Sequence, residues 1–345
     1  MELLYDPTVG MELPKPKRHI SIWIISAVLV LILGFGFLLF GQRIADYFAG
    51  RDYEPSPELA KVIEKLHLTE DADLVLRAVH PVQQNAEEFN KNCPSGDEEM
   101  STLGCFSPSA SQIFIYQIDA EELDGIKESV LAHELLHAIY QRLNNFDRST
   151  VHEALKEYYD AHRDEFEDYL SSYSEKLFYT ELHSIVGQRV KGSDLPETLR
   201  NHYAKYFKNQ DEIAGYYKKY RSVLETLEKN INALHDEVEK IRTGINERRA
   251  EYDQKLASYE KLSADFQKRS SEGAYSNYSE MMKAYDVVKD TYEKLEAERK
   301  VLNEDIDALN EKINQLNDYV DRNRALSRAM DSHVKVEEVP TASAE

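Results

Sequence analysis

The chain has 345 residues, 30% of them charged, and its formal net charge is −21. This excess of acid argues against nucleic acid and against an anionic membrane surface as binding partners. The length suits one or two domains with additional elements.

An almost unbroken apolar run occupies residues 20–40. About 20 apolar residues span the core of a bilayer, whereas the apolar part of a signal peptide has only about 7–15. We therefore predict one transmembrane helix at residues 19–41, after a cytoplasmic tail at residues 1–18. The basic residues just before the helix are Lys15, Lys17 and Arg18. Because positive charge stays in the cytoplasm, we expect the rest of the chain outside the cell membrane, beginning with a linker at residues 42–57.

Cys93 and Cys105 are the only cysteines, and both lie on the predicted outer side. An oxidising compartment allows them to form a disulfide, and they lack the CxxC spacing of many metal sites. Two free thiols are the alternative. We predict the disulfide, which would fix a loop just before a strand expected at residues 113–118, where Ile and aromatic residues dominate.

The sequence HELLH at residues 133–137 lies in a run that predicts a helix. Residues four apart share one helix face, so His133 and His137 can reach the same metal ion. Glu134 lies beside the open coordination position, where it can take a proton from a water molecule. The alternative is an amphipathic helix with two hydrogen-bonded histidines. The mostly apolar neighbours disfavour that alternative, because burying an unpaired histidine costs free energy. We therefore predict that His133 and His137 bind Zn²⁺ and that Glu134 is a general base.

A third zinc ligand must come from elsewhere in the chain. A metzincin would have Gly and His where Tyr140 and Leu143 stand, so that class is excluded. Glu153 and Glu157 follow the motif in a stretch crowded with charge, which is typical of a solvated helix face. Glu181 has apolar neighbours, and a carboxylate in such a setting needs a partner such as a metal ion. We predict Glu181 as the third ligand.

His183 lies two residues after Glu181, in the same apolar run. It could support a metal ligand from behind, donate a hydrogen bond to an oxyanion, or be an ordinary helix residue. The sequence leaves these three roles open.

These features resemble the gluzincin group of HExxH zinc metallopeptidases, whose third ligand is a Glu on a later helix. More narrowly, residues 55–210 resemble a group of poorly characterised, membrane-anchored bacterial metallopeptidase-like proteins. The matching segments are residues 88–90, 93, 104–106, 123–126, 132–138 and 180–187. The resemblance implies a metallopeptidase-like domain and no particular substrate. It departs at Gln188 and Arg189, where Thr-Glu is usual in the group.

Apolar residues recur at intervals of three and four from about residue 215 to 325, with a break at residues 270–277. This pattern predicts two long helices in a coiled coil at residues 211–328. They would pair as an antiparallel hairpin within one chain, or else between chains. Residues 329–345 are predicted to be a disordered tail. The expected fold is mainly α with a small β element: a zincin-like α+β domain at residues 58–210, the hairpin and one N-terminal transmembrane helix.

The main hypothesis is a membrane-anchored, extracytoplasmic zinc metallopeptidase that hydrolyses peptide bonds with a zinc-activated water. Its partners would be a peptide or protein substrate, the membrane and, for the hairpin, either itself or a coiled-coil partner. A cell-envelope scaffold with a structural or inactive zinc site is the rival, and an amidase acting on a wall polymer is a second enzymatic rival. Glu134 favours an enzyme, since a structural site has no use for a base there.

Overall fold

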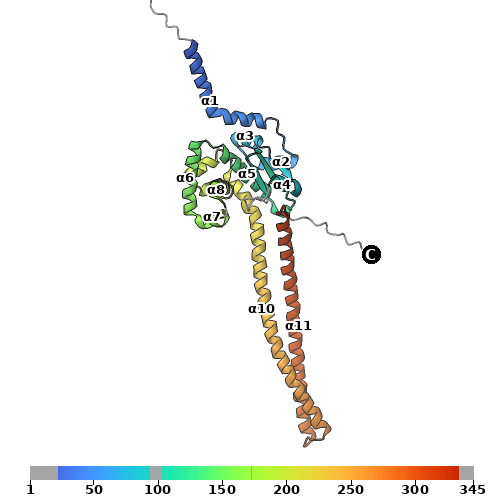
Figure 1. The fold of residues 1–345 in the computed structure, drawn as a ribbon. Helices are drawn as coiled ribbons and strands as arrows, with labels where there is room; N and C mark the ends of the chain where they lie inside the picture. The colour runs from blue at the N-terminus through green and yellow to red at the C-terminus, as the bar shows by residue number, and fades with distance from the viewer. Residues whose placement is uncertain (1–21, 94–102, 172, 334–345) are drawn as a thin grey trace, which may run out of the picture.

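The computed structural model describes residues 22–93, 103–171 and 173–333. As the sequence predicts, the fold is mainly α-helical with a small sheet. Figure 1 shows an N-terminal helix, a compact group of shorter helices around the sheet, and two long helices that project from this group. The predicted tail at residues 1–18 and residues 334–345 of the predicted C-terminal tail lie outside the described residues.

Four α-helices of the described residues precede the motif helix. They are α1 (Ile22–Gly50), α2 (Pro57–Lys65), α3 (Glu70–Ala78) and α4 (Ala86–Asn92). The polar residues Ser56 and Thr69 set the beginnings of α2 and α3, because each side chain accepts a hydrogen bond from a free backbone amide of the first turn. The apolar faces of α2 and α3 then pack into the core.

The sheet has three strands in the order β1-β3-β2. The strands are β1 (Val82–Gln84), β2 (Gly104–Ser107) and β3 (Gln112–Tyr116). β1 runs parallel to β3 and β2 runs antiparallel to it, so β1 and β2 are the two edges. The strand predicted at residues 113–118 is present as β3, which begins at Gln112 and ends at Tyr116. The predicted pairing of Cys93 with Cys105 is confirmed, and it ties the end of α4 to β2.

The motif helix α5 (Ile126–Arg142) crosses the middle of the compact part and is mostly buried. It is followed by α6 (Asn145–Ala161), α7 (Arg163–Leu170), α8 (Glu175–Arg189) and α9 (Glu197–Tyr203). α9 ends at Tyr203, and the chain turns directly after it. This turn lets Phe207 reach the core and form an isolated β-bridge with Leu68.

The predicted hairpin consists of α10 (Gln210–Ser271) and α11 (Tyr278–Ala329). At 1.5 Å per residue they measure about 90 Å and about 80 Å. They lie side by side within one chain, as Figure 1 shows, and ion pairs such as Lys255–Glu298 and Lys312–Glu237 join them.

Both ends of the hairpin are attached to the compact part. Ile213 of α10 and Leu326 of α11 are buried in the same core as α5. Just after α11, the Ser332 hydroxyl donates to the Asn90 side chain of α4, and the Asn90 amide donates to the Ser332 carbonyl oxygen. The hairpin is thus held at its start and at its end.

The predicted transmembrane segment begins before the described residues, and its part from residue 22 onward is the first portion of α1. Within the described residues, no helix is both long enough and apolar enough to cross a membrane.

Candidate metal centre

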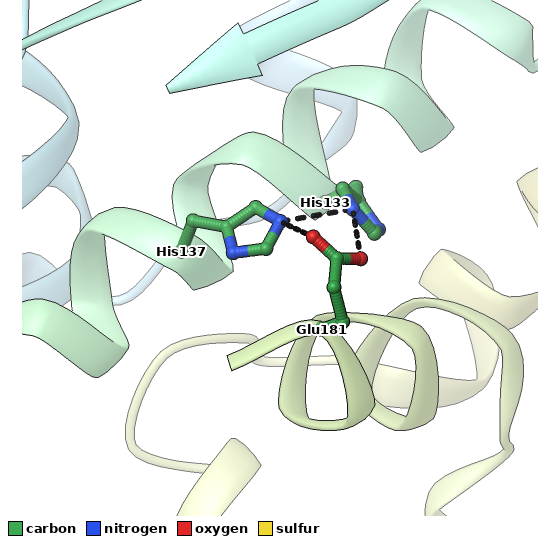
Figure 2. Close-up of side chains that lie close together, drawn as sticks. All are labelled: His133, His137 and Glu181. Carbon is green, nitrogen blue, oxygen red and sulfur yellow. Dashed lines mark hydrogen bonds and ion pairs between the residues drawn. The ribbon is translucent and has the colours of Figure 1, made fainter. Parts of the chain in front are cut away.

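Three side chains from two helices converge beside the sheet (Figure 2). His133 and His137 come from successive turns of α5, and their Nε2 atoms lie 3.0 Å apart. Glu181 comes from α8, with Oε1 3.0 Å from His137 Nε2 and Oε2 3.5 Å from His133 Nε2. These atoms all lie within 4.8 Å of one another, so the group could hold a metal ion.

The geometry of the group fits a small divalent cation. Tetrahedral zinc with bonds of about 2.0–2.1 Å would place neighbouring ligand atoms roughly 3.3 Å apart. His137 Nε2 lies 3.0 Å from His133 Nε2 and 3.0 Å from Glu181 Oε1, and the other carboxylate oxygen, Oε2, lies 3.5 Å from His133 Nε2, so each contact is close to this value. Two imidazole nitrogens that face each other at this distance repel through their lone pairs unless a proton or a cation lies between them. A metal ion would satisfy both nitrogens and the carboxylate at once.

Glu181 is almost completely buried, with 1% of its surface exposed. Burial alone would raise the pKa of its carboxyl, but His137 and His133 outweigh burial and bring the pKa below its usual range. The side chain is therefore an anion inside the protein, which is the form that binds a metal ion. Glu153 and Glu157, the alternatives weighed from the sequence, are exposed on α6.

Thr180 orients one of the histidines, a role that the sequence did not reveal. Its Oγ1 lies 3.0 Å from His137 Nδ1. If Nδ1 carries the proton and donates it to Thr180, the lone pair of Nε2 faces Glu181 and the metal position. The signal in the sequence is only that Thr180 precedes Glu181, and nothing local indicates that it reaches His137.

His183 does not face the metal position. It is fully buried, and its Nε2 lies 2.8 Å from Nε2 of His202. The ring packs against Tyr140 and Tyr203, and the Tyr203 hydroxyl donates to the His183 carbonyl oxygen. Burial, followed by the nearby His202, holds the pKa of His183 well below its usual range. A neutral ring in this position supports α5 from behind, and it is not aimed at an oxyanion.

Glu134 is 6% exposed and lies against the edge strand β2. A Cβ atom at Gly104 of β2 would lie 2.6 Å from Val130 Cγ1 and 3.1 Å from Glu134 Oε1. Only glycine therefore lets the strand come this close to the Glu134 carboxylate. No local pattern in the sequence connects Gly104 with Glu134.

Contacts between α5 and α8 fix the distance between the histidines and Glu181. The Gln188 amide donates to both the carbonyl and the hydroxyl oxygen of Ser129, at 2.9 Å. Arg189 lies between the rings of Tyr169 and Tyr217, 4.3 and 4.5 Å from their centroids. The two residues that depart from the expected Thr-Glu pair thus fasten α8 to its neighbours.

Comparison of the chain with protein-family models, curated proteins and solved structures finds no match. The gluzincin resemblance therefore rests on the motif residues alone.

Proposed function

We propose that this chain is a zinc metallopeptidase with a zincin-like domain. The observation that carries the proposal is the convergence of His133, His137 and Glu181 with Glu134 one residue along the helix. Structural zinc sites usually use four protein ligands, whereas catalytic sites use three and leave one position open. Three ligands beside a buried carboxylate favour the enzyme over the scaffold rival.

The donor set favours zinc among the common divalent ions. Two imidazole nitrogens and one carboxylate oxygen suit zinc, while calcium and magnesium prefer sites made of oxygen. Bound zinc would acidify a water and polarise the scissile carbonyl. Glu134 would accept the proton of that water and pass it to the leaving amine. His137, held by Thr180, and His133 would keep the ligand atoms in place.

The edge strand β2 supports a peptide as the substrate. Its outer edge has no partner strand among the described residues, and its Gly104 lies against Glu134. An extended peptide can add to such an edge through backbone hydrogen bonds, which would place its carbonyls near the base. This arrangement favours peptide hydrolysis over cleavage of a wall polymer.

The disulfide between Cys93 and Cys105 supports an extracytoplasmic location, because disulfides persist in oxidising compartments. The disulfide and the apolar N-terminal segment together support a peptidase that is anchored in the cell membrane, with its N-terminus in the cytoplasm and its metal centre outside. The hairpin of α10 and α11 would extend the protein away from that anchor.

The test is cleavage of a broad peptide library by the full, zinc-loaded chain and by its Glu134→Gln variant. The variant removes the base and leaves the three ligands, so it should keep its zinc and lose cleavage by about 10²-fold or more. Glu153→Gln, which changes an exposed Glu on α6, is the matched control and should cleave like the parent. Equal cleavage, or none, by the parent and Glu134→Gln would favour the scaffold.

A further inference from the structure

The helix that carries the apolar N-terminal segment continues onto the compact part and is fixed there. In the second half of α1, Asp46 is 5% exposed, and both of its carboxylate oxygens lie 3.1 Å from Arg142 Nε. Arg43 of the same helix forms an ion pair with Asp71 of α3. Arg142 belongs to the last turn of α5, so α1 is joined directly to the helix that bears His133 and His137.

The opposite face of this half of α1 is apolar and exposed. Phe40, Ile44, Tyr47 and Phe48 have 50 to 62% of their surface exposed. Their spacing of four, three and one residues places them on one side of a helix, away from Asp46. A helix on a soluble domain normally turns its apolar face inward, whereas this helix turns its apolar face outward.

The described side chains near the start of α1 are exposed as well. From Trp23 to Ile32, every described side chain is exposed, and Trp23 itself is 84% exposed. A helix that is apolar all round is matched by lipid or by other protein. Figure 1 shows α1 bending, so that its second half lies across the compact part, and the hairpin leaves from the other side.

We propose that the outward face of α1, formed by Phe40, Ile44, Tyr47 and Phe48, lies in the surface of a lipid bilayer. Aromatic residues beside a basic residue such as Arg43 are typical of helices that lie in the interface. Lipid is favoured over a protein partner because the same helix also carries the exposed apolar side chains from Trp23 to Ile32.

The metal centre then works close to the membrane surface. Arg142 follows His137 by five residues, or about 7.5 Å along α5. Helices in contact have axes about 8–10 Å apart, so His137 lies within about 20 Å of the second half of α1. An extended peptide covers that distance with about six residues. On the basis of the proposed peptidase function, the substrates are membrane-tethered polypeptides, and the bond that is cut lies within roughly six to ten residues of the membrane.

The membrane contact can be tested without any activity. Trp23 is the only tryptophan, so Trp23→Phe gives a background in which one new tryptophan reports its own surroundings. The full chain carrying Phe48→Trp is reconstituted in phosphatidylcholine vesicles with brominated acyl chains. Its emission should fall at least about twofold, because interfacial helices bury their apolar face at the acyl boundary.

The matched control is Tyr278→Trp, which replaces a side chain that is 73% exposed at the far end of the hairpin. Its emission should not change with bromination. Phe48→Trp emission that is insensitive to bromination would overturn the proposal, and so would a stable dimer of the chain that protects this tryptophan from lipid.

The substrate class is tested with a peptide that the enzyme cleaves when free in solution. The peptide is attached to a lipid anchor through proline-rich spacers of roughly 6 and roughly 40 residues, which extend by about 3.1 Å per residue. The vesicle-bound enzyme should cleave the short form at least about tenfold faster, because only that form holds the bond near the site. Equal rates with active enzyme would overturn this inference alone. Failure to cleave even the free peptide would overturn the peptidase function, and with it the substrate class, while the tryptophan result would still decide the membrane contact.

Discussion

Replacing Gly187 by Ala should weaken the metal site from the far side of α8. A Cβ atom at this position would lie 2.5 Å from Tyr203 Cε1 and 2.7 Å from Leu136 Cδ1. Carbon atoms normally approach to about 3.5–4.0 Å, so α8 or its neighbours must move by about 1 Å. Tyr203 is fully buried and cannot swing away. The motion therefore falls on the contact between α8, which carries Glu181, and α5.

Two opposing effects set the size of the change. Overpacking of this kind costs about 1–3 kcal/mol of unfolding free energy, while Ala gains about 1 kcal/mol over Gly within a helix. We expect a net loss of up to about 2 kcal/mol. Metal sites tolerate ligand shifts of only about 0.2 Å, so zinc affinity should fall by at least about tenfold.

The assay combines urea denaturation with competitive zinc titration. Gly215→Ala in α10 is the control, because its new methyl group would meet no atom within 4 Å. That variant should be stabilised by up to about 1 kcal/mol and should bind zinc like the parent. Unchanged zinc affinity in Gly187→Ala would refute the claim that the packing of α8 on α5 sets the position of Glu181.

Three further outcomes follow from the structure. Gly104→Ala should keep zinc and slow peptide cleavage, since its methyl group meets the Glu134 carboxylate; an unchanged kcat would contradict this. Burial lowers the pKa of His202 to about 4 in the folded protein, from an ordinary value of 6.5. Between these two pH values the imidazole therefore takes up a proton in the unfolded chain but not in the folded one. Stability should fall by up to about 3 kcal/mol as the pH drops from about 6.5 to 4, and urea denaturation of His202→Gln should show a flatter pH profile. Replacing Cys93 and Cys105 together by Ser should lower the free energy of unfolding by about 3 kcal/mol, because the disulfide joins residues 12 apart in the sequence. An unchanged free energy of unfolding would contradict this expectation.

The motif helix and the position of Glu181 could be predicted because their signals are local. The spacing of His133 and His137 fixes their common face once the segment is helical. The apolar residues around Glu181 indicate burial, and burial of a carboxylate demands a partner. The long helices of the hairpin could also be predicted, since their apolar residues recur over many turns.

The contacts that complete the site could not be predicted, because they join residues far apart in the sequence. Thr180 meets His137, and Gly104 meets Glu134, only after α5 packs against α8 and β2. The role of Asp46 could not be predicted either, because in the sequence it is only one more charged residue near the apolar segment. Only the docking of α1 turns it into a buried partner of an α5 residue. The heptad pattern likewise does not show that both ends of the hairpin enter the core.

Zinc stoichiometry of the purified full chain tests the central claim most directly, because every proposed role depends on a metal ion held by three side chains. The parent and Glu153→Ala should each carry about one zinc per chain. His137→Ala and Glu181→Ala should lose it, with the fold retained by circular dichroism. Full zinc occupancy in Glu181→Ala, or no zinc in the parent after loading, would contradict the site described here.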